Sequence, residues 1–286
     1  MSGEFEMGDH IDKAISAEEK AQGKVLLCCT TAKSDLKINV PGFNPNALPV
    51  RTLPVRIETI EIKHDVALLR LALPKVPSFA FYAGQYIDLL LPGNISRSYS
   101  IANSPDQEGV LELHIRKREN GVCSEMIFGA EPKIKEKGIV RVKGPLGTFT
   151  LQQDSNKPIV LLATGTGYAP IRSILLDLIY QNSERPVHFY WGARQKEDLY
   201  ALEEAEALIG RLKNAKFSPV LSKPDSNWKG ENGYVQNVAA QNYPDLSQYE
   251  VYACGSPAMT ESAQSLLTQK CAVPEDAFFC DAFSPA

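Results

Sequence analysis

The sequence predicts two domains of different class, an antiparallel β-barrel followed by an α/β domain with a parallel sheet. Between residues 54 and 147, short runs rich in Val, Ile, Leu and Tyr alternate with turn residues, as in a small antiparallel barrel. From residue 158 onward, apolar strand-like runs alternate with segments of helical periodicity. We therefore expect the barrel at residues 51–150 and the α/β domain at residues 155–286.

The residues before the barrel are expected to form a small segment of their own, residues 1–40, joined to the barrel by a linker at 41–50. Strand-like stretches surround the pair Cys28-Cys29. The six residues that follow Val40 contain two prolines, a glycine and two asparagines, and this composition favours a turn or an extended linker.

In the α/β domain, strand and helix signals follow one another in order. Apolar runs predict strands at 159–163, 187–191, 217–221, 249–253 and 277–281. Helical periodicity predicts helices at 171–181, 196–213 and 257–269. This alternation is typical of an open parallel sheet with helices on both faces.

Composition excludes several classes of function. The chain of 286 residues is 44% apolar and 22% charged, which is typical of a globular protein. Its formal net charge of −4 gives no global attraction to nucleic acid, and no apolar run is long enough to span a bilayer. The six cysteines lack the spacing of a secreted scaffold and no signal peptide precedes them, so we expect a cytoplasmic location.

The first motif is Arg97-Ser98-Tyr99-Ser100. On a strand, Arg97 and Tyr99 project to one face while the two serines project to the other. A guanidinium can grip a phosphate, an aromatic ring can stack on a flat heterocycle, and a hydroxyl can hydrogen-bond a ring nitrogen. These are the contacts that a flavin mononucleotide moiety requires. The alternative is an edge strand with a surface arginine and a half-buried tyrosine.

The second motif, Gly121-Val122-Cys123-Ser124, follows a strand and opens an amphipathic segment. Free backbone amides and the helix dipole at such a position favour a pyrophosphate. A plain turn with a helix cap is the alternative. Together with Arg97, this turn would hold the two phosphates of a dinucleotide flavin, so FAD is favoured over FMN.

The third motif, Gly165-Thr166-Gly167-Tyr168-Ala169-Pro170, lies between a buried-strand run and a helix whose start suits Pro170. Its glycines let the backbone approach a pyrophosphate, although the full fingerprint with three glycines is not present. A glycine turn that binds no ligand is the alternative.

The fourth motif, Cys254-Gly255-Ser256-Pro257, follows the strand at 249–253, at the carboxyl edge where ligands of such sheets bind. Gly255 permits the close approach of a flat ring. Cys254 is either a buried structural thiol or a residue that packs against a nicotinamide.

With these motifs in this order, residues 50–286 resemble the ferredoxin-NADP reductase superfamily. Residues 165–173, 190–194 with 198–200, and 278–283 are similar to CDP-6-deoxy-3,4-glucoseen reductases and oxygenase reductase components. The resemblance implies an oxidoreductase that passes hydride from NAD(P)H to bound FAD. Single electrons then leave for an iron-sulfur centre or an acceptor protein, such as a dehydratase or oxygenase component.

The resemblance also implies a role for each motif residue. The flavin is held by Arg97, Ser98, Tyr99 and Ser100, lined by Ile115, Arg116 and Lys117, and bound at its pyrophosphate by Gly121, Val122, Cys123 and Ser124. NAD(P)H is held by Gly165, Thr166, Gly167 and Pro170, with Cys254 and Gly255 at the nicotinamide and Asp281 and Phe283 near the flavin. Ser100, as a hydrogen-bond partner of flavin N5, and Cys254 are the expected catalytic residues.

The start of the chain carries a second resemblance, because Leu27-Cys28-Cys29 followed by Ser34-Asp35 is similar to the end of a plant-type ferredoxin domain. This implies that Cys28 is the fourth ligand of a [2Fe-2S] cluster. The C-x4-C-x2-C loop that holds the other ligands does not occur between Met1 and Cys28. We therefore expect this chain by itself to hold no cluster and both cysteines to be buried thiols.

The choice of nicotinamide cofactor and two rival functions remain open in the sequence. Arg194 follows the strand where an adenosine 2′-phosphate would sit, but it suits adenine stacking or pairing with Glu197 equally well. The resemblance favours NADH. The rival functions are a reductase of free flavin or quinone and a nucleotide-binding module without turnover.

Overall fold

The computed structural model describes residues 3–8, 15–38 and 48–283. The chain divides into two compact units, Met1–Ala47 and Leu48–Ala286. Most of the predicted linker at 41–50 lies outside the described residues.

The N-terminal unit contains two short strands and one helical turn. Strand β1 (Phe5–Met7) pairs antiparallel with β2 (Thr30–Ala32), and α1 (Ala17–Ala21) begins at Ser16 with a capping box. The pair Cys28-Cys29 lies in a 3₁₀ turn, Leu27–Cys29, and the strand begins only at Thr30. Local hydrogen bonds close this turn, because Leu26 O accepts from both Cys29 N (3.0 Å) and Thr30 Oγ1 (2.8 Å). The side chain of Cys28 is outside the described part of the chain.

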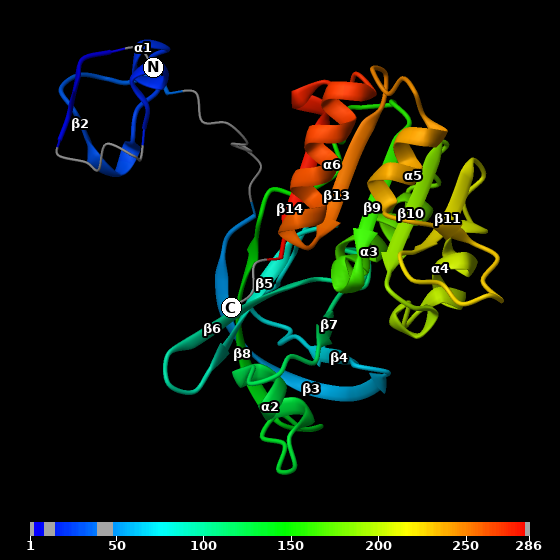
Figure 1. The fold of residues 1–286 in the computed structure, drawn as a ribbon. Helices are drawn as coiled ribbons and strands as arrows, with labels where there is room; N and C mark the ends of the chain where they lie inside the picture. The colour runs from blue at the N-terminus through cyan, green and yellow to red at the C-terminus, as the bar shows by residue number, and fades with distance from the viewer. Residues whose placement is uncertain (1–2, 9–14, 39–47, 284–286) are drawn as a thin grey trace. The chain divides into compact units, whose positions relative to one another are not determined.

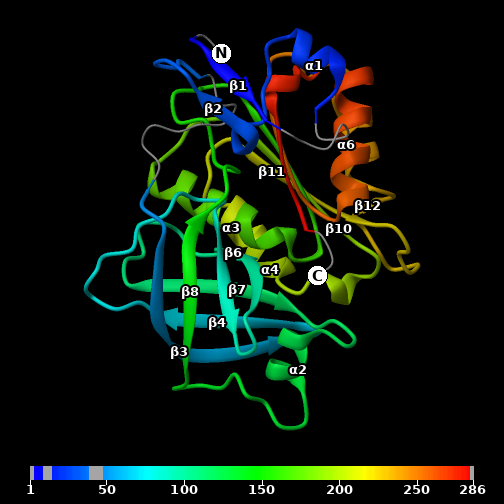
Figure 2. The same cartoon turned by 90° about the vertical axis from the view of Figure 1, so that its left-hand side faces the viewer.

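The second unit begins with a six-stranded antiparallel sheet of order β6-β5-β8-β3-β4-β7. Its strands are β3 (Arg51–Lys63), β4 (Val66–Ala72), β5 (Tyr86–Leu91), β6 (Ile95–Ser100), β7 (Val110–Arg116) and β8 (Ile139–Leu146). The sheet curls until its two outer strands meet at a bridge between Ile101 and Leu113 (Figures 1 and 2). Helix α2 (Val122–Phe128) inserts Cys123 and Ile127 into the apolar core that the curled sheet encloses. The predicted barrel is therefore a curled sheet closed by one bridge.

A six-stranded parallel sheet follows, with the order β12-β11-β10-β9-β13-β14. Its strands are β9 (Ile159–Thr164), β10 (Val187–Ala193), β11 (Ala215–Leu221), β12 (Glu231–Asn232), β13 (Glu250–Gly255) and β14 (Phe278–Ala282). Its helices are α3 (Tyr168–Tyr180), α4 (Leu202–Ile209), α5 (Val235–Asn242) and α6 (Pro257–Lys270). Helices α3 and α4 pack on one face of the sheet, and α5 and α6 on the other. The predicted α/β fold with helices on both faces is confirmed.

The helix predicted at 196–213 is the clearest local difference from the sequence analysis. The structure has a 3₁₀ turn at Lys196–Asp198, and α4 begins only at Leu202. Between them, Leu199 and Tyr200 are buried, and the Tyr200 hydroxyl bonds His114 of the antiparallel sheet. These contacts hold the chain in an irregular path that a continuous helix would not allow.

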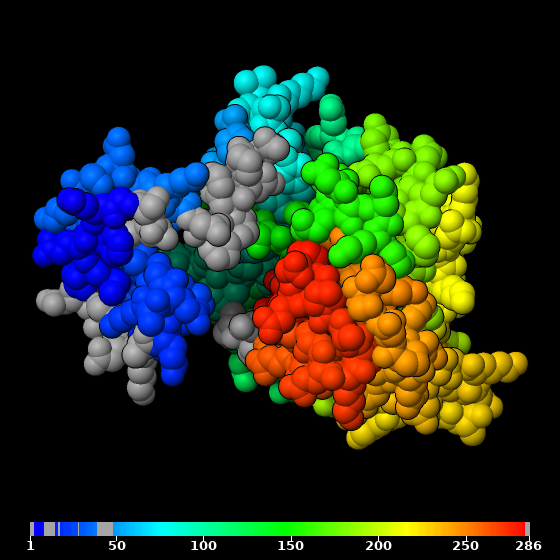
Figure 3. All heavy atoms as spheres, turned by 90° about the horizontal axis from the view of Figure 1, so that it is seen from above, coloured from blue at the N-terminus to red at the C-terminus, as the bar shows by residue number. Residues whose placement is uncertain are grey.

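Seen from above, the C-terminal part of the chain, drawn orange to red, lies beside residues from the middle of the chain, drawn green (Figure 3). Among the described helices, none combines the length and the apolar character that crossing a membrane requires.

Candidate functional site

The parallel sheet reverses its strand order between β9 and β13. From β9 the chain proceeds outward to β10 and β11, whereas β13 continues to β14 on the other side. Sheets of this kind bind ligands at such a switch point, beyond the carboxyl ends of the strands. The Gly165–Gly167 turn follows β9, and Cys254 and Gly255 are the last residues of β13, so two motifs that are far apart in sequence meet there.

Two glycines allow these segments to pack against each other. A Cβ on Gly167 would overlap the carbonyl of Cys254, and a Cβ on Gly255 would overlap Thr164. Gly255 also has a φ of +144°, which side chains rarely adopt. The Ser256 amide donates to Thr164 Oγ1 at 3.3 Å, so the two turns form one continuous surface.

The first glycine of the turn is held by an aromatic stack. Gly165 has a φ of +54°, and its carbonyl accepts a 3.0 Å hydrogen bond from Trp191 Nε1. The Trp191 ring stacks on Tyr168, with centroids 4.3 Å apart. Thr166 is partly exposed at the turn, whereas Pro170 is buried in the first turn of α3. Arg194 lies exposed just beyond β10.

Arg116, the last residue of β7 in the antiparallel sheet, lies next to the Gly165–Gly167 turn. A Cβ on Gly165 would lie 3.3 Å from Arg116 Nη1. Arg116 Nε is 3.1 Å from Asp65 Oδ2, and its Nη2 is 3.9 Å from Asp198 Oδ1. Within the described residues, Arg116 Nε and Nη2 are nevertheless buried without a hydrogen bond, as is Asp65 Oδ1. We call His64, Asp65, Arg116 and Asp198 the Arg116 cluster. The guanidinium nitrogen nearest the glycine turn is Nη1, and its N–H groups suit an anionic group there.

The neighbours of Arg116 on β7 are placed differently. The side chain of Ile115 is buried in the core of the antiparallel sheet, and Lys117 is exposed beyond the strand end. The three residues that sequence reasoning assigned together to the flavin therefore face three environments.

Strand β6 carries the arginine and tyrosine motif at the outer edge of the antiparallel sheet. Arg97 Nη1 donates to Ser96 O at 2.8 Å, and Ser98 Oγ donates to Asp88 Oδ1 at 2.7 Å. Tyr99 is half-buried, and Ser100 is buried at the strand end.

The two predicted flavin motifs lie side by side. Tyr99 shares a hydrogen bond with Cys123 of α2, and burial, followed by the nearby Cys123, raises the pKa of the Tyr99 phenol. In the second motif, Ser124 Oγ accepts from the Arg118 amide at 2.8 Å, so this hydroxyl closes the turn before α2. Gly121 is the N-cap of α2, and Val122 is partly buried.

The C-terminal strand approaches the same end of the antiparallel sheet. Asp281 is the register partner of Cys254, and the Phe283 amide donates to Gly255 O at 2.7 Å. Burial raises the pKa of Asp281 to about 6. The pKa of Tyr86 is raised by burial and then by Asp88 and Asp281, and Tyr86 pairs with Ser100. The chain end and the end of the flavin motif are therefore neighbours.

Cys254 itself is suited to packing. Its side chain is fully buried, and burial, followed by the charge of Asp281, raises the pKa of its thiol well above the ordinary value. A thiol that keeps its proton is a poor nucleophile and a good apolar contact. Among the residues that the structure describes, no group of three His, Cys, Asp or Glu side chains is arranged to hold a metal ion.

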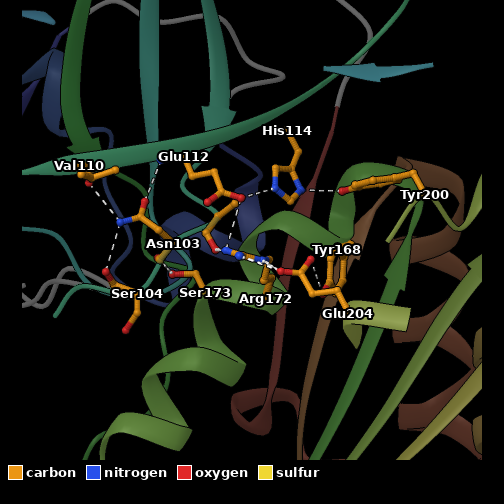
Figure 4. Close-up of polar contacts among 11 residues, drawn as sticks. Asn103, Ser104, Val110, Glu112, His114, Tyr168, Arg172, Ser173, Tyr200 and Glu204 are labelled. Carbon is orange, nitrogen blue, oxygen red and sulfur yellow. Dashed lines mark hydrogen bonds and ion pairs between the residues drawn. The ribbon is translucent and has the colours of Figure 1, made fainter. Parts of the chain in front are cut away.

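Sequence reasoning missed a second polar cluster between the sheets (Figure 4). We call its members the Arg172 cluster: Glu112 and His114 from β7, with Arg172, Tyr200 and Glu204 from the parallel-sheet part. A signal was present, because Glu112 and His114 interrupt an apolar strand and Arg172 lies five residues beyond the glycine turn.

The atoms of the Arg172 cluster are paired. His114 Nε2 is 3.0 Å from Glu112 Oε1, and its Nδ1 is 2.8 Å from the Tyr200 hydroxyl. Burial lowers the pKa of His114, so the neutral ring donates from Nε2 and accepts at Nδ1. Burial alone would raise the pKa of Glu112, but the His114 hydrogen bond and the Arg172 charge hold it below its ordinary value.

Comparisons with known proteins agree with this arrangement. The chain matches the oxidoreductase FAD-binding domain over residues 55–151 and the oxidoreductase NAD-binding domain over residues 161–265. It is 40% identical over 289 residues to the CDP-6-deoxy-L-threo-D-glycero-4-hexulose-3-dehydrase reductase of Yersinia pestis, covering 100% of this chain and 85% of that protein. It is 34% identical over 297 residues to the propane 2-monooxygenase reductase component of a Gordonia species, covering 100% and 85%.

A solved structure gives the same result for the fold. A cytochrome P450 reductase of Amycolatopsis superposes with a TM-score of 0.80 at 29% identity, covering 100% of this chain and 86% of that one. The two domain matches, the relatives and the solved structure agree. The chain therefore belongs to the ferredoxin reductase-like family of oxidoreductases, in which an FAD-binding domain precedes an NAD-binding domain.

Proposed function

We propose that strand Arg97–Ser100 and turn Gly121–Ser124 hold FAD, and that the turns after β9 and β13 hold NAD(P)H facing it. The observation that carries the proposal is the meeting of these two turns at the switch point, where each also approaches the antiparallel sheet. Gly165 lies beside Arg116, and Asp281 lies near Tyr86. The proposal assigns FAD to a sheet of residues 51–150 and NAD(P)H to residues 155–286.

The bound cofactors supply the chemistry, which is hydride transfer from NAD(P)H to FAD and the release of single electrons to an acceptor. The protein binds and orients them. Arg97 offers its guanidinium to a phosphate, Tyr99 stacks on the flavin ring, and Ser100 offers a hydroxyl proton to N5. The roles of Arg97 and Tyr99 require a strand whose alternate residues face the same ligand, whereas Ser100 would act from the end of that strand.

Two further residues shape the nicotinamide side. Arg116 places its Nη1 beside Gly165, which suits the pyrophosphate of NAD(P)H. Cys254 retains its proton and, with Gly255, forms an apolar wall against which a nicotinamide packs and from which water is excluded. The remaining contacts proposed for NAD(P)H come from Thr166, Gly167 and Pro170, and those for the flavin edge from Asp281 and Phe283.

The proposed electron acceptor is a partner protein, a dehydratase or oxygenase component. Support comes from the relatives, which are named as reductases of such systems. Cys28 is proposed as a [2Fe-2S] ligand only where a cluster loop with further cysteines precedes it.

An anaerobic visible spectrum before and after one equivalent of NADH tests the central proposal. A flavin spectrum that NADH bleaches is the expected result. Bleaching without retention of flavin through purification would favour a free-flavin reductase. Absence of a flavin spectrum even after FAD is added would refute the assignment of Arg97–Ser100.

The Arg97→Met variant tests the flavin motif directly. Loss of a charged hydrogen bond costs about 1.5–3 kcal/mol, so we expect the Kd for FAD to rise about 10- to 100-fold. Arg141→Met, an exposed arginine on β8 of the same sheet, is the matched control and should bind FAD as the wild type does. FAD titration of the cofactor-free proteins measures both values, and equal Kd values would contradict the motif's role.

NADH is the proposed nicotinamide cofactor, and Arg194 is the residue that tests the choice. It is exposed just beyond β10, where a 2′-phosphate would sit. We expect Arg194→Glu to leave turnover with NADH unchanged. A selective loss of NADPH turnover in this variant would show that Arg194 binds the 2′-phosphate, whereas unchanged NADPH turnover would remove that role.

A further inference from the structure

Helix α3 is bonded directly to the segment that follows the flavin strand. Arg172 Nη1 donates to Ala102 O at 2.7 Å, and Ser173 Oγ donates to Asn103 O at 2.7 Å (Figure 4). Ala102 lies two residues beyond Ser100, and Arg172 lies two residues beyond Pro170. Each of the two predicted cofactor motifs is therefore followed, two residues later, by one partner of this hydrogen bond.

The accepting segment is fixed to its own sheet. Asn103 is fully buried, and its Nδ2 donates to Ser104 O at 3.2 Å and Val110 O at 3.1 Å. Its Oδ1 accepts from the Glu112 amide at 2.8 Å, while the Ala102 amide donates to Glu112 O at 2.8 Å. The carbonyls that accept from α3 therefore cannot move without breaking the edge of β7.

The donating side is connected to the glycine turn. Arg172 Nε and Nη2 lie 2.9 and 2.8 Å from Glu204 Oε1, and the Tyr168 hydroxyl donates to Glu204 Oε2 at 3.4 Å. Tyr168 stacks on Trp191, whose Nε1 bonds Gly165 O. A continuous set of contacts therefore runs from the guanidinium to the first glycine of the turn.

We propose that Arg172 and Ser173 are positioning residues that set the spacing between the nicotinamide and flavin sites. The proposal rests on the function proposed above, in which the two cofactors are held by different sheets. Their spacing then depends on contacts between the sheets, and these two donors bond the residues nearest both motifs. Hydride transfer is sensitive to such spacing, since a misplacement of about 1 Å can slow a reaction about 100-fold.

The kinetic test compares Arg172→Met, Arg172→Lys and Ser173→Ala with the wild-type FAD-loaded protein. Arg172→Met should slow flavin reduction in a single turnover about 10- to 100-fold, with Kd values for FAD and NAD⁺ changed less than about 3-fold. Arg172→Lys should recover part of the rate, because one ammonium can reach either Ala102 or Glu204 but not both in the geometry of the guanidinium. Ser173→Ala should have the smallest effect.

Arg185→Met is the matched control. Arg185 is also buried and paired, with Nη2 2.7 Å from Glu250 Oε2 and Nε 2.8 Å from Lys157 O, but it bonds no residue of the antiparallel sheet among those described. It should lose stability as Arg172→Met does and keep the wild-type rate of flavin reduction. An equal slowing in both variants would overturn the positioning role.

Hydrogen exchange of the cofactor-free proteins provides a readout that needs no turnover. Arg172→Met should raise exchange of the amides at 101–104 and 165–168 together, whereas Arg185→Met should raise neither. If the wild type binds no FAD, the proposed function is wrong, and the role proposed for Arg172 is then decided by hydrogen exchange alone. Unchanged exchange at 165–168 in Arg172→Met would overturn it.

Discussion

The Arg172 cluster and the Arg116 cluster join the same two sheets, and both use residues of β7. In the Arg172 cluster, the guanidinium lies between Glu112 and Glu204 and also bonds a backbone carbonyl. In the Arg116 cluster, Arg116 Nε and Nη2 and Asp65 Oδ1 are buried without a hydrogen bond among the described residues. Buried polar groups normally have partners. The difference indicates that the first cluster is complete as it stands, whereas the second has donors to offer to a ligand.

Removing each arginine should affect stability very differently. Arg172→Met leaves the partly buried carboxylates of Glu112 and Glu204 without their cation and the Ala102 carbonyl without its donor, so we expect the free energy of unfolding to fall by about 2–3 kcal/mol. Arg116→Met removes poorly aligned ion pairs that are partly exposed, and we expect a loss of about 1 kcal/mol or less. Urea titration of the cofactor-free proteins measures both. Similar losses would mean that the Arg116 cluster is as fully bonded in solution as the Arg172 cluster.

Ligand binding should reverse this order. If the Arg116 guanidinium binds the pyrophosphate through Nη1, Arg116→Met should raise the Kd for NAD⁺ about 10- to 100-fold, equivalent to about 1.5–3 kcal/mol. Arg70→Met, on β4 and paired only with Glu58 among described side chains, should leave this Kd unchanged. Titration of the oxidised, FAD-loaded proteins measures binding without turnover. A Kd unaffected by Arg116→Met would limit Arg116 to a structural or flavin-lining role.

Asp281 extends the comparison of paired and unpaired buried charges to a carboxyl. Burial without a compensating cation raises the pKa of Asp281 from 3.8 to about 6. The unfolded state then binds fewer protons than the folded state between these pH values, so this carboxyl lowers stability as pH rises through that window. We expect Asp281→Asn to gain about 1–2 kcal/mol relative to the wild type between pH 4 and pH 7, after allowance for partial exposure.

Asp245→Asn is the control for that measurement and should have the opposite sign. The Ser247 amide donates to Asp245 Oδ1 at 2.8 Å, and this bond lowers the pKa of Asp245. Its stabilising effect is therefore present at neutral pH and lost on acidification. Unfolding of both variants and the wild type, followed across pH in cofactor-free protein, gives the two slopes. A pH-independent difference for Asp281→Asn would contradict the raised pKa.

Local patterns were sufficient to predict most of the fold. Short runs rich in Val, Ile, Leu and Tyr between turn residues identified the antiparallel strands, and continuous apolar runs such as 159–163 identified buried parallel strands. Helix α5 escaped prediction because its buried face consists of few apolar residues, Val235, Val238 and Ala239. The helix at 196–213 was predicted too long because Tyr200 is held by His114, a residue 86 positions away. The predicted domain boundaries stay predictions.

The site was predictable only where the residues form a local motif. The turns at Gly165–Gly167 and Cys254–Gly255 carry their own signature, and the strand order explains why they meet. The orientation of Arg116 depends on how β7 approaches the parallel sheet, which no local pattern encodes. Two partners of Arg172, Ala102 and Glu112, lie 70 and 60 positions earlier in the chain and were recognisable only in the structure.

The two bonds from Arg172 and Ser173 limit how this protein can be recombined. In a chimera that keeps residues 48–150 and takes its NAD-binding half from another reductase, Ala102 and Asn103 would meet a foreign helix in place of α3. Without matching donors, two buried carbonyls would lose their partners, at about 1–3 kcal/mol each. Because the acceptors are backbone carbonyls, the incoming NAD-binding half needs an arginine and a serine at the positions of Arg172 and Ser173 to keep these bonds, and a crossover chosen by domain boundary alone does not ensure this.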